Sequence, residues 1–204
     1  MTFDDQIAAA ELALRDLDPT LGRLIVAQAP LGRTPSTTPY FTNLARSIIG
    51  QQVSVAAASA IFGRLQAATG LDPHKVITLS PDELRAYGIS RGKAGYIHDL
   101  AEHFVKDAAI FDHLERLPDD EVITELVAVK GIGIWTAQMF LMFTLGRLDV
   151  FAPDDVGLQR AIVRLYGLPA VPTKAELTAI AERWRPFRTV ACWHLWHSLD
   201  NAPT

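Results

Sequence analysis

The segment from Leu126 to Phe140, LVAVKGIGIWTAQMF, constrains the fold more than any other part of the chain. Apolar residues at helical spacing lead up to Gly131 and Gly133, and a second apolar helical pattern begins directly after them. Glycine permits such a short turn, because it allows backbone angles and close approaches that a Cβ would forbid. The spacing therefore predicts two helices joined by a very tight turn, with Ile132 packed between them.

The start of the second helix suits an anion. Its first backbone N–H groups face outward at the positive end of the helix dipole, which favours a phosphate. An ordinary αα-hairpin is the alternative, but the apolar Val129 before the glycines and the small Thr136–Ala137 pair after them favour a helix-hairpin-helix that binds nucleic acid. The residues that we expect to contact DNA here are Gly131, Ile132, Gly133, Ile134 and Thr136.

Composition limits the class of protein. The 204 residues are 49% hydrophobic, which is enough for one sizeable core or two smaller ones. The single cysteine, Cys192, cannot form an internal disulfide or hold an iron–sulfur cluster. The formal net charge of −4 argues against a protein that coats nucleic acid by bulk attraction, although it permits one that binds a few phosphates at helix ends.

The beginning of the chain and its apolar runs bear on location. Residues 1–18 are acidic and contain no basic n-region, which predicts no signal peptide. The longest uncharged runs, 47–63 and 131–146, contain polar residues and are too short to span a membrane. We therefore expect a cytoplasmic protein without membrane contact.

Helical spacing recurs along most of the chain, and no strand pattern of useful length occurs, so we predict an all-α fold. One pair of helices flanks Gly50-Gln51-Gln52, and Ser54 stands where it can cap the second helix. The two glutamines therefore form a polar tip between buried helices. Solvated surface would explain such a tip equally well.

Two consecutive aspartates follow the hairpin in the sequence VFAPDDV. An aspartate at the start of a helix most simply caps it. Two in a row allow one side chain to cap the helix while the other points elsewhere. The second of them, Asp155, lies 22 positions after Gly133.

A tight hairpin followed at this distance by an aspartate that opens another helix resembles the helix-hairpin-helix (HhH-GPD) superfamily of DNA glycosylases. Within it, WTAQMF and FAPDD are similar to the AlkA type, 3-methyladenine DNA glycosylase II. The resemblance implies two helical subdomains flanking a cleft. Residues 39–150 would form a central bundle that ends in the hairpin (126–146), and 1–38 with 151–204 would form the other, carrying the catalytic aspartate and the C-terminal tryptophan helix.

The resemblance assigns catalysis to Asp155 and leaves Asp154 as its structural partner. Cleavage of an N-glycosidic bond leaves positive charge on the deoxyribose, which a fixed carboxylate stabilises. In bifunctional relatives, a lysine two residues after the second hairpin glycine attacks the sugar, whereas here that position holds Trp135. We therefore predict a monofunctional glycosylase without AP-lyase activity.

The resemblance also implies a base pocket. Trp135 and Trp196 match aromatic positions that line the pocket of the AlkA type, and Met139 stands where the family has a tyrosine. Trp193 fits the pocket and plain burial equally well. Aromatic rings attract N3- or N7-alkylated purines because alkylation makes these bases cationic.

The string Ile-x-x-Gln-Gln-x-Ser recurs in the superfamily, where the residue at the second Gln fills the gap left by an extruded base. Gln52 has that place here, with Gln51 and Ser54 as neighbouring DNA contacts. Lys93 lies at the start of a later predicted helix, and its spacing alone indicates a solvated surface cation. The resemblance makes it a DNA backbone contact.

The expected partner is double-stranded DNA that contains alkylated bases, bound by a monomer in base excision repair. The resemblance implies no cofactor and no catalytic metal, and it leaves room for a structural monovalent cation at the hairpin. Three alternatives remain open: a non-catalytic helix-hairpin-helix module that only binds DNA, an oxidised-base glycosylase of the same fold, and a purely structural helical protein.

Overall fold

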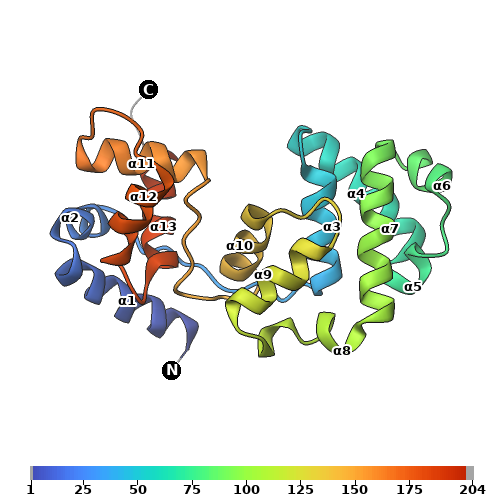
Figure 1. The fold of residues 1–204 in the computed structure, drawn as a ribbon, viewed down its shortest axis with the longest axis horizontal. Helices are drawn as coiled ribbons and strands as arrows, with labels where there is room; N and C mark the ends of the chain where they lie inside the picture. Colours follow the sequence, from blue (N-terminus) through green and yellow to red (C-terminus); the bar gives the residue numbers. More distant parts are fainter. Residues whose placement is uncertain (1, 201–204) are drawn as a thin grey trace. The chain divides into compact units, whose positions relative to one another are not determined.

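The computed structural model describes residues 2–200, and this part of the chain is built of helices and connecting turns without a strand (Figure 1). The prediction of an all-α fold is confirmed. No helix among these residues is long and apolar enough to cross a membrane.

The chain forms two compact units. Unit 1 combines the described parts of Met1–Ser36 and Leu145–Thr204, and unit 2 is Thr37–Thr144. The second boundary therefore falls after residue 144, earlier than the residue 150 expected from sequence. The reason is Thr189, whose Oγ1 donates to the carbonyl of Arg147 at 2.7 Å and accepts from the N–H of Val150 at 2.9 Å, so that this segment is bound to unit 1.

Unit 1 consists of α1 (Phe3–Leu17), α2 (Pro19–Ala27), α11 (Val156–Tyr166), α12 (Lys174–Glu182) and α13 (Arg188–Asp200). The buried Asp18 joins the N-terminal helices to the C-terminal ones. Its Oδ1 caps α2, and its Oδ2 accepts from the hydroxyl of Tyr166 and from Nε1 of Trp184. Burial alone would raise the pKa of Asp18, but these hydrogen bonds outweigh it and hold that pKa below its usual value.

Unit 2 consists of α3 (Tyr40–Gly50), α4 (Val55–Thr69), α5 (Pro73–Val76), α6 (Pro81–Ala86), α7 (Arg91–Lys106), α8 (Ala108–Phe111), a 3₁₀ turn (Leu114–Arg116), α9 (Asp119–Ala128) and α10 (Ile134–Phe143). Helix α7 runs through the middle of this unit and packs against α3, α5, α6 and α8 (Figure 1). It buries Ile97, Leu100 and Phe104 at helical spacing. Because α7 is held on several sides, it is a rigid support for the loops around it.

Candidate functional site

The predicted hairpin is present in unit 2. Helix α9 ends at Ala128 and α10 begins at Ile134, and Ile132 between them is buried at 4% exposure. Gly131 has a φ of +85°, and a Cβ there would come within 2.3 Å of Cδ2 of Tyr96. Gly133 differs, because a Cβ built on it would meet nothing within 4 Å. The first glycine is required by the protein itself, whereas the second leaves open space before α10.

The exposed residues of α10 lie at its N-terminus. Gly133 is the N-cap and supplies no side-chain hydrogen bond, and the first N–H groups of a helix have no acceptor within that helix. Ile134 and Trp135 are 49% and 45% exposed. Thr136 is only 8% exposed, so its side chain belongs to the interior and not to the surface predicted to contact DNA.

The predicted polar tip is the loop of residues 51–54, which we call the Gln loop. Gln52 stands exposed at a φ of +56°, a backbone conformation uncommon for residues other than glycine. Ser54 caps α4 through a hydrogen bond from Ala57 N to its Oγ, as expected. Gln51 is directed inward, and its Nε2 donates to the carbonyl of Gly131 at 2.9 Å.

Lys93 makes contacts that its spacing in the sequence did not predict. Its Nζ donates to the carbonyl oxygen of Ile49 at 2.8 Å and also to that of Gln51, so the ammonium binds the end of α3. Burial lowers the pKa of this half-buried lysine. These contacts hold the ammonium of Lys93 on the end of α3.

Asp155 lies at the N-cap of α11, half-buried in unit 1. Its Oδ1 accepts two hydrogen bonds, from Leu158 N at 2.8 Å and from the indole Nε1 of Trp196 at 2.9 Å. Asp154 is exposed and accepts from Lys174 Nζ at 2.6 Å. Asp155 is therefore itself the cap of α11, which begins at residue 156, while Asp154 pairs with Lys174 and does not cap the helix.

Gly157 makes the contact between Asp155 and Trp196 possible, although no motif in the sequence points to it. A Cβ at this position would lie 3.2 Å from Cδ1 and Nε1 of Trp196 and 3.0 Å from Asp155 Oδ1. Glycine disfavours helices by about 1 kcal/mol relative to alanine. A glycine in the first turn of a helix was thus the signal that something packs closely there.

The four predicted pocket residues lie in different surroundings. Trp193 is 1% exposed and packs against the ring of Phe3, with Arg33 over its own ring, so the structure supports plain burial for this residue. Trp196 is half-buried and bound to Asp155. Trp135 and Met139 belong to α10 in unit 2, where Met139 and Thr136 help to line a hollow of about 160 Å³.

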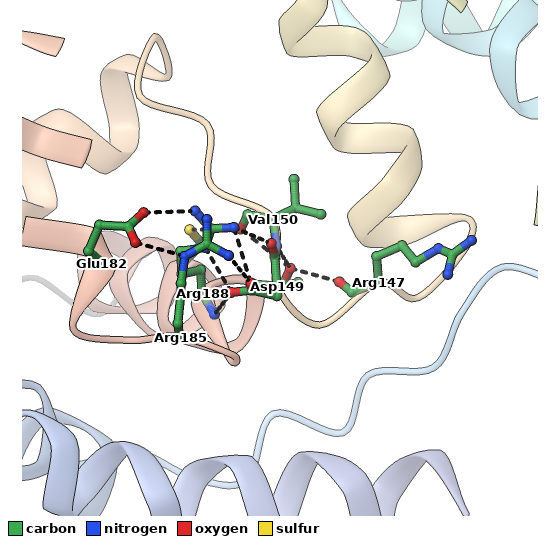
Figure 2. Close-up of polar contacts among 8 residues, drawn as sticks. Arg147, Asp149, Val150, Glu182, Arg185 and Arg188 are labelled. Carbon is green, nitrogen blue, oxygen red and sulfur yellow. Dashed lines mark hydrogen bonds and ion pairs between the residues drawn. The ribbon is translucent and has the colours of Figure 1, made fainter. Parts of the chain in front are cut away.

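The segment that leads to Asp155 is fixed by an ion network that sequence reasoning did not find (Figure 2). Asp149 accepts from Nε of Arg188 at 2.7 Å and from Nη1 of Arg185 at 2.7 Å. Glu182 accepts from the same two arginines. The backbone before the aspartates is thereby anchored to α12 and α13, the second of which also carries Trp196.

No cluster of three or more His, Cys, Asp or Glu side chains that could hold a metal ion occurs among residues 2–200.

Comparison with known proteins shows which family has this sequence and fold. Residues 45–186 match the family model described as HhH-GPD superfamily base excision DNA repair protein. DNA-3-methyladenine glycosylase 1 of Schizosaccharomyces pombe is 32% identical over 93% of this chain and 86% of its own. The crystal structure of a DNA-3-methyladenine glycosidase from Bacillus halodurans has a TM-score of 0.85 and 38% identity over 94% of this chain and 89% of its own. The S. pombe 3-methyladenine DNA glycosylase Mag1 in complex with abasic DNA has a TM-score of 0.80 and 31% identity, over 95% and 98% of the two chains.

Proposed function

The chain belongs to the HhH-GPD superfamily of base excision DNA repair proteins, and we propose that it hydrolyses the N-glycosidic bond of alkylated nucleotides by means of Asp155. It is a DNA glycosylase of the 3-methyladenine type, like the relatives described above, and its partner is DNA. The observation that carries the proposed role of Asp155 is its carboxylate, held at a helix N-terminus by two donors to Oδ1. A group fixed in this way needs little reorganisation during the reaction.

The proposed reaction is a hydrolysis at C1′ of the damaged nucleotide. The oxygen of a water molecule bonds to C1′, the C1′–N bond breaks, and its electron pair leaves with the base. The carboxylate of Asp155 stabilises the positive charge on the sugar and accepts the proton of the water. Trp196 is a positioning residue in this scheme, because its N–H holds one carboxylate oxygen.

The substrate class follows from the leaving group. A purine methylated at N3 or N7 is cationic and leaves as a neutral base, so the reaction needs no strong general acid. The exposed indole of Trp135 offers a face for a cationic base, and such contacts contribute about 0.5–2 kcal/mol. We propose that Trp135 and Met139 of α10 contact the extruded base, and we leave Trp193 to the core.

The absence of lyase activity is part of the proposal. A lyase step requires an amine that attacks C1′, and the position two residues after Gly133 holds Trp135. The nearby Lys130 places its Nζ 2.8 Å from Asp99 Oδ1, and this hydrogen bond raises the pKa of Lys130. A protonated and paired ammonium is a poor nucleophile.

We further propose that the N-terminus of α10 binds a phosphate of duplex DNA, while Gln52 fills the gap left by the extruded base. The phosphate site is supported by the exposed Ile134 and by the N-cap Gly133, which gives α10 no side-chain hydrogen bond. The role of Gln52 is supported by its exposed position at the tip of the Gln loop. One chain supplies every group that this scheme uses, so we propose that the protein acts as a monomer.

The experiment is product analysis on a methylated duplex. The proposal predicts free 3-methyladenine and 7-methylguanine, and strands that break only after alkali treatment of the abasic sites. Strand breaks without alkali would contradict the monofunctional assignment. DNA binding without any base release would instead indicate the non-catalytic binding module.

A further inference from the structure

The two loops of unit 2 with proposed DNA contacts are joined to each other. Gln51 in the Gln loop donates from Nε2 to the carbonyl oxygen of Gly131 in the hairpin turn (residues 129–133), at 2.9 Å. The two residues are 80 positions apart in the chain. This hydrogen bond sets the position of one loop relative to the other.

Helix α7 supports the Gln loop through Lys93. Its Nζ donates to the carbonyl oxygens of Ile49 and Gln51, the last acceptors at the end of α3. A cation at a helix C-terminus is favourable, because it meets carbonyl groups that have no partner within the helix. The same helix end therefore binds Lys93 and leads into Gln51.

Helix α7 supports the hairpin turn through two further residues. The ring of Tyr96 lies so close to Gly131 that no Cβ would fit between them. Asp99 accepts from the backbone N of Lys130 at 2.9 Å and from its Nζ at 2.8 Å. Lys93, Tyr96 and Asp99 follow one another at intervals of three residues, which places them along one side of α7.

The apolar side chain of the Gln loop is largely in solvent, because Val53 is 40% exposed. Gln52 is exposed too, and a hollow of about 210 Å³ lies beside the loop, lined by loop residues together with Ile61, Ile89 and Lys93. The φ of +56° at Gln52 is uncommon for this residue type, so the surrounding contacts must maintain it. The hydrogen bonds of Lys93 and Gln51 hold the backbone directly before Gln52 and so contribute to this support.

We propose that Lys93 and Gln51 are positioning residues: they fix the Gln loop against the hairpin turn, so that Gln52 can enter the DNA stack when the phosphate is bound. This inference rests on the proposed function, because Gln52 has a gap to enter only where a base is extruded. It replaces the assignment of Lys93 to a DNA phosphate.

The test separates positioning from phosphate binding by two readouts in the Asp155→Asn background. The first is the slope of log Kd against log salt concentration on a duplex with a tetrahydrofuran abasic analogue. The second is base extrusion, followed by the fluorescence of 2-aminopurine placed as the target base of a duplex. The variants are Lys93→Met, Gln51→Met and their combination, with Arg91→Met as a control that removes an exposed cation from the same end of α7.

Lys93→Met is expected to reduce the equilibrium extent of extrusion about tenfold, as for the loss of a hydrogen bond to a charged group, and to leave the salt slope unchanged. Gln51→Met should reduce extrusion as well. The combined variant should lose less than the product of the single losses, because both residues fix one loop. Arg91→Met should extrude like its parent.

A salt slope that falls by about one unit in Lys93→Met, with extrusion retained, would overturn the proposal and restore the phosphate contact. The proposal would also be overturned if Lys93→Met changed neither the salt slope nor the extent of base extrusion. If circular dichroism shows that Lys93→Met does not fold, Gln51→Met decides, because normal extrusion by that variant would also contradict the proposal. If the wild-type protein neither released nor extruded bases, the proposed function itself would be contradicted.

Discussion

Helices α10 and α11 are similar in length, but their N-termini are capped in different ways. Helix α10 in unit 2 begins after Gly133, which supplies no side chain, so its first turn is open to an external anion. Helix α11 in unit 1 begins after Asp155, whose carboxylate already accepts from the first turn. An anion at either helix end is favoured by the dipole. The residue at the N-cap decides whether the first turn is left without a side-chain acceptor or already has a carboxylate of the protein itself.

The comparison also shows how each end is made specific. The open end of α10 depends on a hairpin turn that is held by Gln51, Tyr96 and Asp99 of the same unit. The occupied end of α11 depends on Trp196, a donor 41 positions away that fixes the carboxylate. Both ends therefore rely on distant side chains, and substitutions at either end should separate binding from chemistry.

Gly133→Asp would convert the open end into the occupied type. We expect about a hundredfold weaker binding to duplex DNA, because the new carboxylate meets a phosphate and like charges in contact cost several kcal/mol. Fluorescence anisotropy measures the affinity. Gly133→Ala is the matched control, and it should bind within about threefold of wild type because its Cβ meets no neighbour. Equal affinities of the Asp variant and wild type would show that this helix end is not the phosphate site.

Gly131→Ala tests the turn itself. We expect a loss of stability on the order of 1–3 kcal/mol, since alanine at a φ of +85° is strained and its Cβ would collide with Tyr96. Urea denaturation gives the change, with Gly133→Ala as the reference for a glycine without such a neighbour. Equal stability of the two variants would contradict the different roles of the two glycines.

Trp196→Phe tests the occupied end. The ring stays apolar but the N–H donor to Asp155 is lost, and we expect base release to slow about tenfold, a usual cost for removing a group that orients a reacting one. DNA affinity should stay near that of wild type. Trp193→Phe serves as the control, because Trp193 lies in the core and not on Asp155. A greater loss of turnover in Trp193→Phe than in Trp196→Phe would reverse the assignment.

The smallest expected effect is on how the stability of the protein depends on pH, through Asp18 in unit 1. The pKa of Asp18 is lower in the folded protein than in the unfolded chain, so its contribution to stability is present above the unfolded pKa and is lost as pH falls through the folded one. Unfolding curves between about pH 5 and 2 should therefore show a smaller acid-dependent loss of stability in Asp18→Asn than in wild type. Identical acid limbs would contradict the role given to these hydrogen bonds.

The sequence predicted those parts of the site that are encoded locally. The hairpin, the cap at Ser54 and the tip at Gln52 follow from glycines, caps and helical spacing within a few residues, and the structure contains all three. Asp155 could be singled out because its distance from Gly133, which the sequence gives directly, matches the pattern of the superfamily that the chain resembles.

Contacts between distant segments could not be predicted in this way. Spacing gives Lys93 an exposed place at a helix start, and only the fold shows that the end of α3 supplies its acceptors. Helix α13 is apolar on several sides, so periodicity could not distinguish the buried Trp193 from Trp196 beside Asp155. The same holds for the bond between Gln51 and Gly131, which joins two separate loops.

The central claim is tested most directly by the single-turnover rate of base release from methylated duplex DNA, measured for Asp155→Asn beside its neighbour Asp154→Asn. We expect Asp155→Asn to be slower than wild type by about 100- to 1000-fold and still to bind DNA, because it loses only the charge that we propose to act on the sugar. Asp154→Asn should stay within about twofold, since it loses only an exposed pairing with Lys174. Equal rates for the two variants, or a greater loss at residue 154, would contradict the central claim.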